Sequence, residues 1–256
     1  MTLMHWAILS VCIFAVLAIG MPVVLRAVLG VKRGTTNTWR ERVELRYQNI
    51  GTWVWMFAHV KLRVDAMFRE LPEFVKVMPN PRTAMDLGCG HGFAACALLE
   101  WFGDLKLYGV EPSAGRVGTA ARAMGERGVV VQGAAPDFEW PGLPDRVDVV
   151  FALDMMHFLS ESDFDLTLRR IRTRLEDGGY LVIRTPMAPA GFGSWAWHLG
   201  KITRKIQGVS AFHRSIEQIQ EAVAAAGFQM TKVQMSGGNP ELYWFIATAV
   251  HRHGVP

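Results

Sequence analysis

Cysteine is scarce in this sequence, which contains only Cys12, Cys89 and Cys96. Three cysteines make no even disulfide framework, and their spacing matches no metal-binding pattern. Small secreted domains held by disulfides and cysteine-ligated metal centres are therefore excluded as classes. We expect reduced thiols in the cytoplasm and no metal cofactor.

The chain also lacks a basic stripe, although its formal net charge is +4. The excess is local: ten Lys and Arg side chains face five acids between Arg26 and Lys76, whereas the rest has 17 basic and 18 acidic residues. A local excess is consistent with anionic lipid headgroups. Nucleic acid is not an expected partner, because no basic stripe accompanies the motifs described below.

Charge is missing altogether from Trp6 to Leu25, a run of twenty residues. A helix of that length spans about 30 Å, the thickness of a bilayer core. A cleaved signal peptide or a buried helix are the alternatives, but a signal peptide needs positive charge before the apolar run. Here Arg26, Lys32 and Arg33 follow it. Since positive residues stay cytoplasmic, we expect residues 1–33 to be a single-pass inner-membrane anchor, with the remaining chain in the cytoplasm.

Residues 34–78 place tryptophan and arginine around an apolar stripe at mostly helical spacing. Such a pattern is typical of an amphipathic helix that lies in the headgroup region of a membrane. An amphipathic helix that packs on the following domain would show the same pattern. Both interpretations stay open.

From Arg82 onward, apolar runs alternate with segments of helical periodicity. This alternation predicts a parallel sheet covered on both faces. The last two strands are joined by a Gly-Gly-Asn-Pro turn at 237–240, which indicates a hairpin. We expect one α/β domain over residues 79–250 and a short tail at 251–256. The predicted strands are 83–87, 106–110, 128–132, 147–152, 179–184, 228–235 and 242–249, and the predicted helices are 92–102, 113–126, 162–176 and 214–226.

The stretch from Met85 to Phe93 carries the most information. Asp86 lies near the end of a strand, and three glycines at alternate positions then lead into a helix. Glycine lets the backbone approach a ligand closely and adopt φ > 0. Twenty-five residues after Asp86 the second strand ends in Glu111, which is well placed to bind both hydroxyls of a ribose. The dinucleotide fingerprint G-x-G-x-x-G differs, because here the third glycine comes one residue early and an acid precedes the first.

This D-x-G-x-G-x-G run, paired with Glu111, resembles the first motif of the class I S-adenosylmethionine (SAM) methyltransferases. The resemblance covers about residues 70–250. It implies a Rossmann-like seven-stranded α/β sheet, SAM as the cofactor and methyl transfer as the activity. It further implies that the glycines line the methionine half of SAM, with Asp86 close to its ammonium group, and that Glu111 holds the ribose. The implied cofactor-binding residues are Asp86, Gly88, Cys89, Gly90, Gly92, Glu111, Pro112, Gly133, Ala134 and Asp154.

One position departs from the family pattern. After the third strand the family often has an acid that accepts a hydrogen bond from the adenine amine, and this chain has Ala134 there. Asp137, Phe138 or a backbone carbonyl are the alternatives for that contact. The missing acid also leaves open a SAM-fold protein at the membrane that binds a ligand or a partner enzyme without catalysis.

Asp154 and His157 follow the fourth strand. At this place the family has an acid or polar residue, and many quinone and small-molecule methyltransferases have a histidine about three residues later. The resemblance therefore implies that Asp154 contacts SAM or the acceptor. Because an imidazole titrates close to neutral pH, His157 is the candidate base that removes a proton from the acceptor. The alternative is a histidine that packs against or caps the following helix.

The connection at 186–212 is long and rich in glycine, phenylalanine and tryptophan. Long connections in compact domains are typical of lids and binding loops, so we expect a substrate lid; a helical surface insertion is the alternative. The segments 46–49, 61–68, 212–215, 226–228 and 238–240 resemble bacterial membrane-associated methyltransferases of small-molecule or quinone type, linked to aryl polyene or lipid-like pathways. A SAM loop in the same chain as an anchor and an aromatic lid predicts an apolar or lipid-linked acceptor. The oligomeric state stays open.

Overall fold

The computed structural model describes residues 38–138, 140–188 and 210–250. The expected anchor at 1–33, the tail at 251–256 and most of the expected lid at 186–212 lie outside these ranges and stay predictions. Among the residues that the structure describes, no helix is both long and apolar enough to cross a bilayer. The chain divides into two compact units, Met1–Val64 and Asp65–Pro256.

The described part of the first unit is a pair of helices, α2 (Trp39–Gln48) and α3 (Thr52–Val64). Thr38 and Glu41 form a capping box that begins α2, because each side chain binds the backbone N–H of the other residue. The carboxylate of Glu44 on α2 is fully buried and is bonded by two side chains of α3, His59 at 2.9 Å and Arg63. These contacts hold the two helices together.

The second unit contains a seven-stranded sheet with the strand order β3-β2-β1-β4-β5-β7-β6. All neighbouring strands are parallel except that β7 runs antiparallel to both β5 and β6. The predicted seven-stranded, Rossmann-like sheet with a final hairpin is therefore confirmed. The strands are β1 (Thr83–Leu87), β2 (Lys106–Glu111), β3 (Gly128–Gln132), β4 (Val147–Leu153), β5 (Leu175–Pro186), β6 (Phe228–Ser236) and β7 (Asn239–Ala249).

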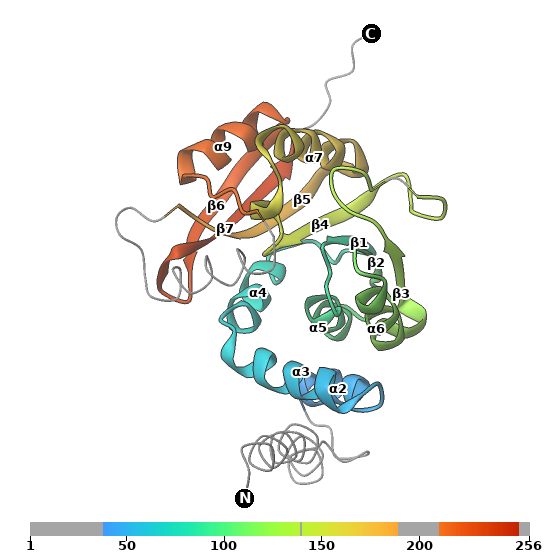
Figure 1. Ribbon diagram of the computed structural model, residues 1–256. Helices are drawn as coiled ribbons and strands as arrows, with labels where there is room; N and C mark the ends of the chain where they lie inside the picture. The colour runs from blue at the N-terminus through green and yellow to red at the C-terminus, as the bar shows by residue number, and fades with distance from the viewer. Residues whose placement is uncertain (1–37, 139, 189–209, 251–256) are drawn as a thin grey trace, which may run out of the picture. The chain divides into compact units, whose positions relative to one another are not determined.

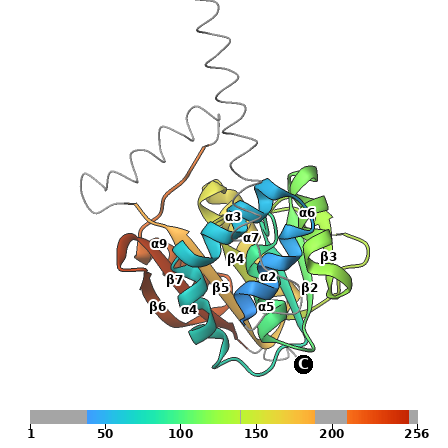
Figure 2. The ribbon, with the colours of Figure 1, turned by 90° about the horizontal axis from the view of Figure 1, so that it is seen from below.

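Helices cover both faces of this sheet (Figures 1 and 2). The helices α5 (Phe93–Trp101) and α6 (Ala114–Met124) lie on one face, while α7 (Glu161–Arg174) and α9 (Ile216–Ala225) lie on the other. Buried residues of α7 and α9, such as Phe164, Leu168 and Val223, pack against the sheet in one continuous apolar core. The two short 3-10 turns are η1 (Gly125–Arg127) and η2 (Met156–Phe158).

A further helix, α4 (Met67–Val75), lies on the same side of the sheet as α5. Its Glu70 carboxylate accepts hydrogen bonds from Trp244 Nε1 and Ser236 Oγ, both at 2.7 Å, and from the Gly237 amide at 2.6 Å. These donors outweigh the effect of burial and lower the pKa of Glu70. Within its unit, α4 is therefore attached to the β6–β7 hairpin, where β5 also ends.

Candidate functional site

The glycine loop after β1 bends sharply over the end of β2. Gly88, Gly90 and Gly92 have φ values of 72°, 59° and 81°, a region in which a side chain is strained. The amides of Gly88 and Cys89 donate to the Val110 carbonyl at 2.8 and 3.0 Å. The loop is thus held by its own backbone, and Gly92 leads directly into α5.

Two of these glycines serve different purposes. A Cβ atom on Gly88 would lie 2.8 Å from Cβ of Met155, so this residue must be small for the loop to pack on the segment after β4. A Cβ atom on Gly90 would meet no atom within 4 Å among the described residues. Gly90 therefore borders open space in which a ligand can approach the backbone.

Glu111, at the end of β2, reaches across to this loop. Its Oε2 accepts a hydrogen bond from the Gly90 amide at 3.0 Å, and Oε1 accepts one from the Ser113 amide at 3.0 Å. The carboxylate is only 3% exposed, and Arg116 lies 3.6 Å away. The structure therefore brings Glu111, the residue predicted to bind the ribose, directly beside the loop predicted to bind the methionine half of SAM.

Asp86 lies buried beneath the same loop, with 2% of its surface exposed. Within the described part of the chain, its Oδ2 atom has no hydrogen-bond partner. Burial, with a smaller contribution from the Glu111 charge, raises the pKa of Asp86 to about 8. A buried acceptor without a partner is costly, and the ammonium group of a SAM-like ligand would supply both the donor and the compensating charge. The residues present therefore fit the cofactor.

The other residues of the loop are less suited to binding through their side chains. The Cys89 thiol lies towards β2, so close that a Cβ atom on Gly109 would be 2.8 Å from its Sγ. Burial and the nearby Asp86 and Glu111 carboxylates raise the pKa of Cys89 above its usual range, which makes the thiol unreactive. Only its backbone is available to a ligand. Burial, with a contribution from Arg116, lowers the pKa of His91.

Asp154 follows β4 in a left-handed conformation, with φ 57°. Its amide donates to the Arg184 carbonyl at 2.7 Å, and its Oδ2 accepts from Arg184 Nη1 at 2.7 Å. The same guanidinium donates to Asp65 Oδ1 at 2.8 Å and to Ser236 Oγ at 3.1 Å. Arg184 is 3% exposed, whereas the side chains of Asp65 and Asp154 are 15% and 36% exposed. The Asp154–Arg184 cluster, formed by these four residues, is thus a charge network around a buried arginine at the ends of β4 and β5.

The motifs do not predict Arg184, but one signal in the sequence points to it. The residue directly follows an apolar run, Leu181 to Ile183, on a strand that the pattern predicts to be buried. A buried arginine needs charged or hydrogen-bonding partners. The pattern does not say which residues those partners are.

His157 lies in η2 and is 7% exposed. Its carbonyl accepts from the Phe212 amide at 2.7 Å, and its ring lies near-parallel to that of His213, with the centroids 6.1 Å apart. The structure thus brings two histidines together after β4. The role of His157 as the base stays a prediction.

At the end of β3, the Gly133 amide donates to the Glu111 carbonyl at 3.1 Å. The loop after β3 therefore lies next to Glu111, the residue predicted to bind the ribose. The two side chains that could replace the missing acid at Ala134 differ in exposure. Asp137 forms an ion pair with Arg170 of α7, and Phe138 is fully buried in the core. The Asp137 side chain is 85% exposed and only its Oδ1 atom binds Arg170, so Asp137 and a backbone carbonyl both stay open as the adenine contact. Pro112 follows Glu111 at the same edge and accepts from Gln132 through its carbonyl.

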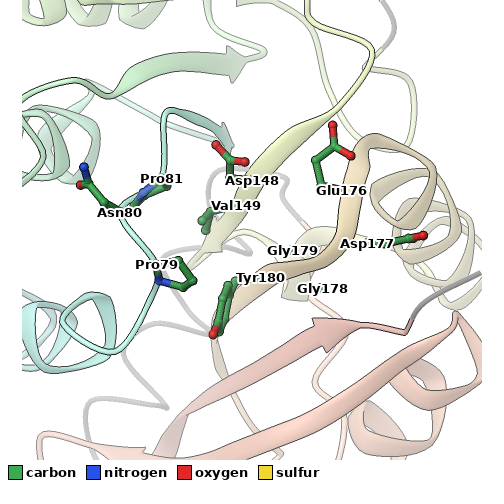
Figure 3. Close-up of a pocket in the computed structure, with 10 residues that line it drawn as sticks. All are labelled: Pro79, Asn80, Pro81, Asp148, Val149, Glu176, Asp177, Gly178, Gly179 and Tyr180. Atoms are coloured by element: carbon green, nitrogen blue, oxygen red, sulfur yellow. The ribbon is translucent and has the colours of Figure 1, made fainter.

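A cavity of about 150 Å³ lies at the opposite edge of the sheet (Figure 3). Its lining comes from residues 79–81 before β1, from the beginning of β4 and from residues 176–180 of β5. The one carboxylate there on β4, Asp148, accepts hydrogen bonds from the Arg82 and Thr83 amides at 2.9 and 2.8 Å. Ligands of open parallel sheets bind at the carboxyl ends of the strands, so this cavity is not the candidate site.

The arrangement at the carboxyl ends matches a known family. A family model described as a methyltransferase domain matches residues 57–233, more than half of the chain. This chain belongs to the SAM-dependent methyltransferase family. The predicted family and its cofactor, SAM, are thereby confirmed.

One curated relative is similar in sequence to part of this chain. An uncharacterized methyltransferase of Geobacillus thermodenitrificans is 30% identical over 101 residues, which are 40% of this chain and 45% of the relative. The match thus spans less than half the length of that curated relative.

Two solved structures share the fold. A SAM-dependent methyltransferase from Mesorhizobium loti has a TM-score of 0.59 at 19% identity, over 73% of this chain and 99% of that one. Human N-acetylserotonin methyltransferase, solved with SAM, has a TM-score of 0.57 at 17% identity, over 88% and 62%. At these identities the likeness shows the fold alone.

Proposed function

We propose that this protein is a membrane-anchored enzyme that moves a methyl group from SAM to an apolar or lipid-linked small molecule at the cytoplasmic face of the inner membrane. The observation that carries the proposal is the contact between Gly90 and Glu111. A glycine amide that borders open space lies 3.0 Å from a buried carboxylate. This pair joins the two halves of a SAM site in a chain that belongs to the family.

Bound SAM supplies an electrophilic methyl group on a positively charged sulfur. The chain's own residues bind and orient this group: Asp86 receives the ammonium, and Glu111 receives the ribose hydroxyls. Both carboxylates are buried, and a dry site strengthens their attraction to a cation. Alignment of the reacting atoms supplies much of the rate, because effective molarities for well-oriented groups reach about 10⁵–10⁸ M.

Two residues after β4 are assigned to the acceptor side. Asp154 is held by Arg184 at 2.7 Å, so its carboxylate keeps one position while SAM and acceptor bind. His157 takes the proton that the acceptor loses, and His213, whose ring lies beside it, is the neighbouring group through which that proton can leave. This assignment applies to an acceptor that loses a proton on methylation.

The decisive experiment is transfer of isotopically labelled methyl from SAM into a membrane extract. Gly90→Arg fills the open space beside the loop and should abolish labelling. Gly178→Arg is the matched control: its φ of 77° is equally left-handed and its Cβ also meets nothing within 4 Å among the described residues, but it lies at the opposite edge of the sheet. Equal labelling by wild type and Gly90→Arg would sink the proposed function.

The membrane location rests on the sequence. Trp6–Leu25 carries no charge and is followed by basic residues, and the segment 186–212, with its tryptophans and phenylalanines, suits a lid for an apolar acceptor. Detergent-free fractionation tests this part on its own. Full-length protein recovered in the supernatant would exclude the anchor and leave methyl transfer in place.

A second candidate function is a SAM-fold protein at the membrane that binds without catalysis. The observation in its favour is the adenine side of the site, where Ala134 replaces the usual acid and Asp137 is paired with Arg170. Calorimetry with SAM and S-adenosylhomocysteine separates the two. No heat with either ligand supports the binding module, whereas binding together with transferred label supports the enzyme.

A further inference from the structure

The helix α3 is apolar on two opposite faces. Its inner face carries Trp55, Ala58 and Leu62, which are 0–1% exposed. The α3 outer face consists of Trp53, Phe57, Val60 and Val64, which are 56%, 50%, 51% and 71% exposed. With 3.6 residues per turn, these four side chains fall within an arc of about 60° and form one stripe roughly 16 Å long.

The contacts with α2 keep this stripe at the surface of its unit. Glu44 is bonded by His59 and Arg63 of α3, and the Arg40 guanidinium donates to the Leu62 carbonyl at 3.2 Å. These bonds orient the inner face of α3 towards α2 and leave the outer face exposed. Four large apolar side chains on three successive turns are more than the scattered exposure of an ordinary surface.

Charge indicates which partner the α3 outer face would meet. Between Trp39 and Val64 the chain has five basic residues against two acidic ones. Lys61 lies beside the stripe, one position after Val60 and four after Phe57. A helix with tryptophan and phenylalanine on one face and basic side chains around them is typical of one that lies in the headgroup region of an anionic bilayer.

The chain itself limits how far this face can be from such a bilayer. Only thirteen residues, 26–38, separate the uncharged run Trp6–Leu25 from the beginning of α2. Fully extended, they reach about 45 Å. If Trp6–Leu25 spans the membrane, α3 is tethered at a high effective concentration near the headgroups.

We infer that the α3 outer face docks on an anionic membrane surface, with Trp53, Phe57, Val60 and Val64 entering the headgroup region and Lys61 contacting lipid phosphates. This inference deepens the membrane location within the proposed function and does not depend on methyl transfer. It decides between the two interpretations of residues 34–78 in favour of the membrane-bound helix for this face, while the inner face packs on protein.

The test uses full-length protein in which a polarity-sensitive dye is attached to Val60→Cys, with Cys12→Ser to remove a competing thiol. Cys89 and Cys96 are buried and should not react. Val77→Cys is the matched control, because Val77 is a valine of the other unit that is 75% exposed. Both proteins are reconstituted into bilayers of phosphatidylcholine alone and of phosphatidylcholine with phosphatidylglycerol.

We expect the dye at Val60, but not at Val77, to be shielded from aqueous iodide and quenched by lipid-borne quenchers in the anionic bilayers. Trp53→Ala should lower the ratio of docked to undocked protein about tenfold, equivalent to about 1.4 kcal/mol. Lys61→Gln should lower it about fivefold, since one basic residue near an anionic surface contributes about 1 kcal/mol.

Two results would overturn the inference. Equal iodide quenching at Val60 and Val77 in both bilayers would show an undocked face. Shielding of Val60 from iodide in the bilayers without quenching by the lipid-borne quenchers would show that residues 1–37 or a second copy of the chain, and not lipid, cover it. Calorimetry with S-adenosylhomocysteine on the same samples keeps the two proposals apart: lost binding in all of them would count against the proposed function and leave the docking result unaffected.

Discussion

The glycine loop and the Asp154–Arg184 cluster lie at the same edge of the sheet but are built in different ways. The loop is held by backbone hydrogen bonds and by a carboxylate only 21 residues away from Gly90. The cluster joins side chains that are up to 119 residues apart. The loop has open space beside it, whereas Arg184 is enclosed and bonded on three sides.

This difference separates binding from stability. A change at Gly90 should alter the affinity for SAM more than it alters folding, because the open space beside Gly90 has no packing to lose. A change in the cluster should do the opposite, because a buried charge that loses its partner destabilises the folded state.

Arg184→Met gives the largest expected effect. It leaves the Asp65 and Asp154 carboxylates without their shared cation, and we expect the free energy of unfolding to fall by about 3–5 kcal/mol, measured by urea denaturation. Arg172→Met is the control: within the described residues Arg172 pairs with one carboxylate, Asp177 at 3.0 Å, whose side chain is 32% exposed, whereas Arg184 pairs with two, of which the Asp65 side chain is only 15% exposed. The loss for Arg172→Met should therefore be smaller, about 1–2 kcal/mol. Equal losses of unfolding free energy in the two variants would show that Arg184 stabilises the fold no more than a single ion pair does.

The pH dependence of stability should reveal Asp86. Its pKa rises from 3.8 to about 8 on folding, so the folded state keeps a proton that the unfolded chain releases. Wild-type stability should therefore fall, relative to Asp86→Asn, as pH rises through that interval, by an amount on the order of a few kcal/mol. Urea titrations of both proteins at several pH values measure this difference.

The same residue provides a test of ligand binding. A cationic group beside Asp86 favours its carboxylate, so S-adenosylhomocysteine binding near pH 7 should release up to about one proton. Calorimetry in two buffers of different ionisation enthalpy counts the protons. An identical count for Asp86→Asn would show that the ligand does not approach this residue.

Glu111→Gln should weaken binding and also cost some stability. The amide oxygen can accept from only one of the Gly90 and Ser113 amides that Glu111 binds, and the charge that receives the ribose hydroxyls is lost. Hydrogen bonds to charged groups contribute about 1.5–3 kcal/mol, so the dissociation constant for S-adenosylhomocysteine should rise about 10- to 100-fold. Glu176→Gln, an exposed acid at the opposite edge of the sheet, should bind as the wild type does. An unchanged dissociation constant for Glu111→Gln would show that Glu111 does not contact the ligand.

The last comparison is between two glycines of the loop, and Gly90→Ala gives the smallest expected effect. Gly90→Ala adds only the strain of a left-handed residue, about 1 kcal/mol. Gly88→Ala also brings a Cβ atom to 2.8 Å from Cβ of Met155 and should cost about 1–3 kcal/mol more. Thermal unfolding measures both, and Met155→Gly should restore part of the Gly88→Ala loss. Equal costs for the two alanines would contradict the different roles assigned to these glycines.

The sequence predicted the sheet closely because its signals are local. The predicted strands at 83–87 and 128–132 coincide with β1 and β3. The main difference lies after α7: the predicted helix runs to residue 176, but α7 ends at Arg174 and β5 begins at Leu175. Leu175 pairs with Val147 of β4, a long-range contact that helical periodicity does not register.

The residues that could contact adenine, after β3, are not distinguished by the sequence motifs. The sequence offered Asp137, Phe138 or a backbone carbonyl in place of the missing acid, and its pattern does not distinguish them. The structure pairs Asp137 with Arg170 and buries Phe138, because α7 lies over this loop. Which side chain faces a ligand depends on the packing of elements that are distant in the chain.

The sequence by itself determined the succession of strands and helices along the chain, the glycine loop and its two acids. Glycine spacing and strand ends are properties of short segments, so they can be read without the fold. Only the tertiary structure decided that Glu111 reaches the Gly90 amide, that Arg184 joins Asp154 to Asp65, and that one apolar face of α3 is buried while the other is exposed. Those relations arise when strand ends and helices meet in space, and each is fixed by burial: a charge or an apolar face must find its partner among the neighbours that the fold provides.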